Sequence, residues 1–142
     1  MNALYNESLE NLDYSSAAIS AEYENCTFQN CNFSDTDLTD IVFEECSFSN
    51  CNFTNAKIKH TAFKNVTFKG CKLMGLHFTN ANPFLLEMSF EDCQLDYASC
   101  YKLKLAKTQF IGCSLKEVDF VEADLTSAVF KQCDLYAATF EY

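Results

Sequence analysis

The sequence predicts an all-β solenoid whose turns of about twenty residues each have four sides of five residues. Large apolar side chains recur every five residues along most of the 142-residue chain. A helix would need a period of 3.6 residues and a flat strand a period of two, so neither fits this spacing. The same residue type also returns at every fourth repeat, which indicates that four repeats complete one turn.

The composition agrees with one folded domain built from repeats. The chain has 14 Phe and nine Cys, but only three Gly and one Pro. This length suits a single domain with its own core, and the aromatic content excludes disorder. No apolar run is long enough for a membrane-spanning helix, so we expect no membrane partner. An ordinary all-β domain uses more Gly and Pro in its turns, so the repeat itself must form the turns.

The first twenty residues fall outside the strict repeat pattern. They are polar and acidic, without the basic start and apolar stretch of a secretory signal. We therefore expect a cytoplasmic protein whose cysteines are mostly reduced. Open coils expose unpaired backbone edges that need covering. The pattern thus predicts an amino-terminal cap at residues 1–20 and one β-helix domain at residues 21–142.

Two trains of large apolar residues run through this domain. The first extends from Phe28 to Phe78 and the second from Phe90 to Phe140, each with a spacing of five. The trains join if two residues are inserted near residues 84–87, and two columns at one-turn spacing then become uniform. The first column is Phe28, Phe48, Phe68, Phe90, Phe110 and Phe130. The second column is Cys31, Cys51, Cys71, Cys93, Cys113 and Cys133. We expect both columns to point into the core as structural ladders.

The repeat unit reads small, polar, large, polar, polar. Residues 123–127 (Ala-Asp-Leu-Thr-Ser) and 133–137 (Cys-Asp-Leu-Tyr-Ala) match the pattern A-(D/N)-L-x-x, and the chain resembles the pentapeptide-repeat family over roughly residues 21–142. The resemblance implies a right-handed quadrilateral parallel β-helix, here with about six coils. Stacked coils are joined by parallel backbone hydrogen bonds at a spacing of about 4.8 Å.

No catalytic, cofactor or metal site is expected. Neither His60 nor His77 lies beside a nucleophile at an interpretable spacing, and the chain has no Gly-rich phosphate loop. The Cys column could be a metal array, a redox relay or a packing column. Packing is favoured, because Cys is a small and commonly buried residue, and because thiolate metal sites converge tetrahedrally rather than in a line. A filled coil has no pocket, so the protein is not expected to be an enzyme.

The insertion is the one place where the repeat rule breaks, and broken local rules often mark function. Two interpretations are open. Phe84 or Leu86 folds back onto the rod, or the loop forms an apolar contact for a partner protein. The candidate contact residues are Pro83, Phe84, Leu85 and Leu86. The exposure of Phe84 distinguishes the two interpretations.

Charge is divided into three segments along the predicted rod. Residues 1–56 carry ten acids and no Lys, residues 57–116 carry nine Lys and four acids, and the remainder carries six acids and one Lys. The net charge of −10 argues against direct nucleic-acid binding. Acidic rods of this fold resemble proteins that imitate DNA, bind DNA gyrase or topoisomerase IV, and protect them from quinolones or toxins. Such mimicry needs a continuous negative surface, which the basic segment interrupts.

We therefore expect a non-enzymatic interaction or scaffold module with an unidentified protein partner, and DNA mimicry is the alternative. The carboxyl end leaves a second question open. The chain stops at Tyr142, two residues past Phe140. Either it is truncated there, or the last coil pairs with another copy to give a homodimer through the C-terminal coil edge.

Overall fold

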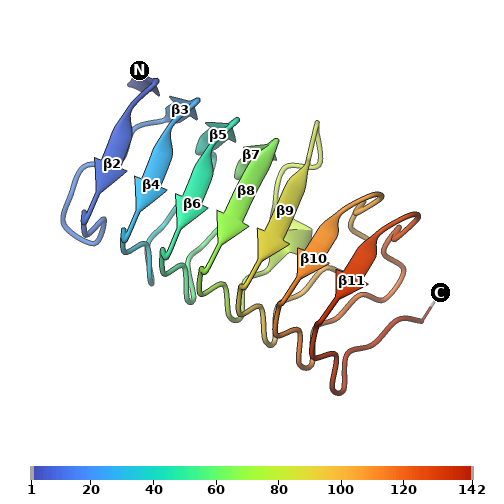
Figure 1. The fold of residues 1–142 in the computed structure, drawn as a ribbon. Helices are drawn as coiled ribbons and strands as arrows, with labels where there is room; N and C mark the ends of the chain where they lie inside the picture. The colour runs from blue at the N-terminus through green and yellow to red at the C-terminus, as the bar shows by residue number, and fades with distance from the viewer. Residues whose placement is uncertain (1, 142) are drawn as a thin grey trace.

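The computed structural model describes residues 2–141, which form a rod of stacked coils (Figure 1). One side of the rod is a parallel sheet of four strands: β1 (Ala3–Tyr5), β3 (Glu22–Glu24), β5 (Val42–Glu44) and β7 (Ala62–Lys64). A second side is a parallel sheet of seven strands: β2 (Ser8–Glu10), β4 (Thr27–Gln29), β6 (Ser47–Ser49), β8 (Val66–Lys69), β9 (Met88–Glu91), β10 (Gln109–Ile111) and β11 (Val129–Lys131).

Turns and isolated parallel bridges form the remaining sides, together with one short 3-10 helix, η1 (Phe78–Asn80). Seven stacked strands are separated by six coil-to-coil steps, so the solenoid has about six turns. The predicted all-β, right-handed quadrilateral β-helix is therefore confirmed. Among residues 2–141 no helix is long and apolar enough to cross a membrane. The cytoplasmic location stays a prediction.

The Phe column lies along the inner face of the seven-stranded sheet. Phe28 pairs with Phe48, Phe48 with Phe68, and the register continues through Phe90 and Phe110 to the last coil. Successive rings are 4.6–5.3 Å apart between centroids and within 12° of parallel. Edge-to-face contacts join this column to the neighbouring sides, which fills the square with aromatic rings.

The Cys column lies on the next side of the square, and its thiols bond to the backbone. Cys51 Sγ donates to the carbonyl of Phe28 at 3.5 Å, and Cys71 Sγ donates to that of Phe48 at 3.4 Å. These thiols therefore join one coil to the preceding one while filling a small space. Free thiols occur at all nine cysteines, and all of them except Cys133 are fully buried.

The cap at residues 1–20 stays a prediction, but the structure shows that the stack of coils extends into this segment. β1 pairs with β3, β2 pairs with β4, and Asp13 bridges Asn32, so these residues extend the stack as its first coil. This coil is one residue shorter than the next, in which β4 pairs with β6. Its inward residues keep the five-residue spacing: Leu4, Leu9, Tyr14 and Ile19. Leu4 stacks on Tyr23 and Leu9 on Phe28, so these residues continue the later columns at an offset of 19 residues rather than 20.

Left-handed corner residues explain why the chain needs so few glycines. A positive φ recurs at five-residue intervals, with values of 54° at Asn25, 55° at Asn30 and 55° at Asp35. Asn and Asp tolerate this conformation better than most residues. The acidic second position of the repeat also supports its turn. Asp37 accepts hydrogen bonds from the Thr39 hydroxyl at 2.6 Å and backbone N–H at 3.0 Å, which lowers the pKa of its carboxyl.

The last described coil is less covered than the one before it. Phe140 is 40% exposed, whereas its counterpart Phe120 is buried. Leu125, Phe130 and Leu135 are only partly buried. A homodimer through this edge stays a prediction.

Removing one ring from the Phe column tests the importance of this packing. Phe68 is fully buried between the rings of Phe48 and Phe90. We expect Phe68→Ala to lower the free energy of unfolding by about 3–5 kcal/mol, measured by urea denaturation. Phe84→Ala is the matched control, because Phe84 is 64% exposed, and it should cost less than about 1 kcal/mol. A loss below about 1 kcal/mol for Phe68→Ala would contradict the packing argument.

Candidate functional site

The surface departs from its regular repeat at a loop that projects beyond the other coils near β9 (Figure 1). Ala62 pairs with Asn82 at the regular one-turn offset, whereas the offset between Val66 and Met88 is longer by two. The two extra residues therefore lie between Asn82 and Met88. We call residues 83–87 the insertion loop.

Both ends of the insertion loop are fixed to the coil that precedes it. The Asn82 backbone N–H donates to the Thr61 carbonyl at 2.9 Å, and the Glu87 N–H donates to the Phe63 carbonyl at 3.0 Å. Within the loop, the Asn82 side chain accepts a hydrogen bond from the Phe84 N–H at 3.0 Å. The loop is thus a tethered turn rather than a free segment.

This turn presents two adjacent apolar side chains to solvent. Phe84 and Leu85 are each 64% exposed. Leu86 is instead partly buried and packs against the core. The sequence left open whether Phe84 or Leu86 folds back onto the rod. In the structure Leu86 folds back and Phe84 does not. Lys64 Nζ lies 5.7 Å from the centroid of the Phe84 ring, so a cation flanks the exposed ring.

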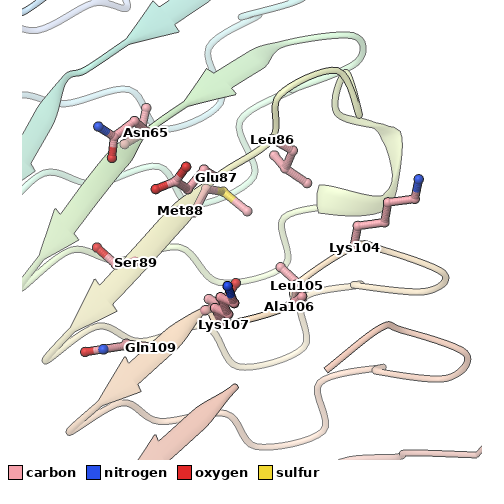
Figure 2. Close-up of a pocket in the computed structure, with 12 residues that line it drawn as sticks. Asn65, Leu86, Glu87, Met88, Ser89, Lys104, Leu105, Ala106, Lys107 and Gln109 are labelled. Atoms are coloured by element: carbon pink, nitrogen blue, oxygen red, sulfur yellow. The ribbon is translucent and has the colours of Figure 1, made fainter. Parts of the chain in front are cut away.

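A groove of about 480 Å³ lies below the insertion loop (Figure 2). Residues 86–89 form one wall and residues 104–109 of the following coil form the other. Figure 2 shows Leu86 and Met88 on the first wall, and Leu105 and Lys107 on the second. We call this feature the loop groove. The sequence did not identify Lys104 and Lys107 as site residues. Pro83 was the available signal, because proline has no backbone N–H to form a hydrogen bond with the next coil.

Charges change sign close to the insertion loop. Glu24 pairs with Glu44 across two coils, and Glu44 pairs with Lys64 in the next coil. A smaller hollow beside the loop is lined by Glu44, Glu45, Lys64 and Leu85, among other residues. The loop therefore stands where the acidic amino-terminal coils meet the basic middle of the rod.

The buried thiols have the properties of packing groups. Burial raises the pKa of Cys46 to about 11 and that of Cys100 to about 12. Hydrogen bonding with the Cys51 thiol, together with burial, raises the pKa of Cys71 to about 12. In residues 2–141 no group of three or more His, Cys, Asp or Glu side chains could hold a metal ion. The expected absence of catalytic, cofactor and metal sites stays a prediction.

Models of known protein families match the repeat. A family model for the pentapeptide repeat region matches residues 20–83 and 41–106, and a second model, for eight copies of the pentapeptide repeat, matches residues 104–141. No curated protein matches the chain.

Solved structures of low sequence identity also match over most of their length. Full-length QnrB1, a plasmid-mediated fluoroquinolone resistance protein, is 19% identical, with a TM-score of 0.45 and coverage of 99% of this chain and 94% of QnrB1. Rfr23 from the cyanobacterium Cyanothece 51142 is 13% identical, with a TM-score of 0.23 and coverage of 98% and 88%. HetL from Nostoc sp. strain PCC 7120, a protein involved in heterocyst differentiation regulation, is 16% identical, with a TM-score of 0.21 and coverage of 96% and 86%.

Thiol reactivity tests the buried state of the cysteines. At pH 8 we expect a disulfide reagent such as DTNB to modify at most the partly exposed Cys133 quickly in the native protein, and all nine thiols in urea. Cys133→Ser should remove the fast phase. Rapid modification of several thiols in the native state would contradict this assignment.

The same thiols should make stability sensitive to alkaline pH. Their native pKa values of about 11–12 lie above the ordinary value of 9.0, so the native state holds protons that the unfolded state releases. This contribution is fully present below pH 9 and is lost as the pH rises toward 12. Urea midpoints measured across this range should therefore fall above pH 9, and midpoints that stay constant to pH 11 would contradict the shifts.

Proposed function

Because the chain belongs to the pentapeptide-repeat family, whose members are typically structural or interaction modules, we propose that it binds a protein partner without catalysing a reaction. The contact is the insertion loop, residues 83–87. The observation that carries this proposal is the exposure of Phe84 and Leu85 on a turn tethered at both ends.

A tethered apolar pair is well suited to binding. Large side chains near the centre of an interface commonly supply most of its binding energy. Less conformational entropy is lost on binding when the backbone that carries such side chains is already anchored. Before the last coil, the other exposed large apolar side chains among residues 2–141 are tyrosines, each of which carries a polar hydroxyl group: Tyr5, Tyr97 and Tyr101. Phe84 and Leu85 have no polar group to offset their exposure.

The test is affinity capture with the immobilised full chain in an extract of its source organism, followed by measurement of the dissociation constant of the captured protein. We expect the double variant Phe84→Ser/Leu85→Ser to weaken binding by at least about 30-fold, which corresponds to a loss of about 2 kcal/mol. Tyr97→Ser is the matched control, because Tyr97 is equally exposed but lies away from the loop. An unchanged dissociation constant in the double variant would refute the loop as the contact.

DNA mimicry is the second candidate, and the acidic amino-terminal coils favour it. Glu24 and Glu44 stack in register, and Glu22 lies on the same sheet. Stacked like charges destabilise a sheet, so their presence is consistent with a use outside folding. A partner of this surface would be basic, like the DNA-binding channel of a type II topoisomerase.

A supercoiling assay with DNA gyrase and topoisomerase IV, with and without a quinolone, tests this candidate. DNA mimicry predicts inhibition or protection at micromolar protein, and Glu24→Lys/Glu44→Lys should abolish the effect by reversing the charge of the ladder. Phe84→Ser is the control that leaves the acidic ladder intact. The absence of any effect at micromolar protein would exclude the mimic.

A further inference from the structure

We propose that the loop groove binds an extended acidic peptide segment of a partner protein, which adds as a strand to the backbone edge at residues 104–107. This inference rests on the proposed function, because it names the kind of partner segment that an interaction module would hold beside its insertion loop. It concerns a surface separate from Phe84 and Leu85.

The first observation is a gap in the coil-to-coil hydrogen bonding. One coil further on, the Asp124 N–H donates to the Leu103 carbonyl at 2.9 Å. The Asp124 and Thr126 carbonyls accept from the N–H groups of Leu105 and Lys107, each at 2.8 Å. By the same register, the Lys104 N–H should donate to the Ala81 carbonyl, and the carbonyls of residues 104 and 106 should accept from residues 83 and 85. Within residues 2–141 none of these three bonds forms.

The insertion explains the gap. Pro83 takes the position of the missing donor to the Lys104 carbonyl, and proline has no backbone N–H. The next residues turn away, because the Glu87 N–H is bonded to the preceding coil through the Phe63 carbonyl. One N–H and two carbonyls of the 104–107 edge are therefore left facing the groove. Unpaired groups along a strand edge are a template for another strand.

The shape of the groove suits an extended segment. The walls run along residues 86–89 and 104–109, and the volume is about 480 Å³. Four residues of a strand span about 13 Å, which matches a wall of four to six residues. Met88 and Leu105 are buried at the base, while Leu86 remains partly exposed above them. Side chains on one face of an added strand would contact Leu86, because Met88 and Leu105 are almost fully covered.

The charges select an acidic segment. Lys104 and Lys107 are both exposed on the edge itself, and no carboxylate of residues 2–141 lies within 4.0 Å of either ammonium group. Asp124 lies one coil below Lys104, and Glu87 lies on the opposite wall. Acidic side chains on the exposed face of the peptide would pair with the two lysines, whereas basic side chains would be repelled.

The experiment uses the full chain and a fluorescein-labelled nonapeptide of alternating Val and Glu, with fluorescence anisotropy as the readout. We expect saturable binding, and at least a tenfold weaker affinity for the variant Lys104→Glu/Lys107→Glu. Lys57→Glu/Lys59→Glu is the matched control, because it makes the same change in net charge away from the groove and should bind within twofold of wild type.

A second arm separates strand addition from simple charge attraction. The same peptide N-methylated at alternate residues keeps its charge. It loses the N–H groups that would donate hydrogen bonds to the carbonyls of residues 104 and 106. We expect this peptide not to bind. The proposal is overturned if the plain peptide fails to bind at 1 mM, if Lys104→Glu/Lys107→Glu binds it normally, or if the N-methylated peptide binds equally well.

The result can be separated from a failure of the proposed function. The peptide assay needs no cellular partner, and Phe84→Ser/Leu85→Ser should leave peptide binding unchanged because neither side chain lines the groove. Loss of the captured partner in that variant, with peptide binding retained, supports both statements. Retained partner binding with lost peptide binding would overturn both.

Discussion

Parallel hydrogen bonding between successive coils is the constraint on which the rest of the structure depends. It places residues twenty apart directly above one another, so a residue that fits one coil fits the next. The pairing of Phe28 with Phe48 and of Phe48 with Phe68 is the clearest result, with rings stacked at 4.6 and 5.2 Å. The Cys column follows from the same constraint, because thiols such as those of Cys51 and Cys71 meet equivalent carbonyls of the preceding coil.

Much of the coil structure could be predicted from the sequence, because hydrogen bonding between coils makes the repeat in space appear as a repeat of twenty residues along the chain. The first coil was missed for a specific reason: it is one residue short, so Leu4 and Leu9 stack on Tyr23 and Phe28 at an offset of 19 residues rather than 20. The repeat pattern also could not predict which apolar residue of the insertion loop packs against the core. Phe84 and Leu86 are both apolar, and which of them packs inward depends on where Asn82 and Glu87 are anchored.

The candidate site arises where the same constraint fails. The loop groove could not be predicted from the sequence, because it depends on three missing hydrogen bonds. These bonds are lost because of the path of the loop rather than the type of residue. Only the absence of an N–H at Pro83 was visible in the sequence. The interior is filled by aromatic rings and thiols, so the candidate contacts all lie on the outer surface. Three chemically distinct candidate contacts lie there: the stacked Glu24 and Glu44, the exposed Phe84, and the lysines of the 104–107 edge.

The pairing offset returns to its regular value as soon as the insertion has passed, as the bridge between Lys104 and Asp124 shows. A change in chain length is therefore absorbed within a single turn, and the coils on either side keep their register. This locality has an evolutionary consequence. A lineage can gain, lengthen or discard a surface loop by a small insertion or deletion, without a change in the framework that carries it.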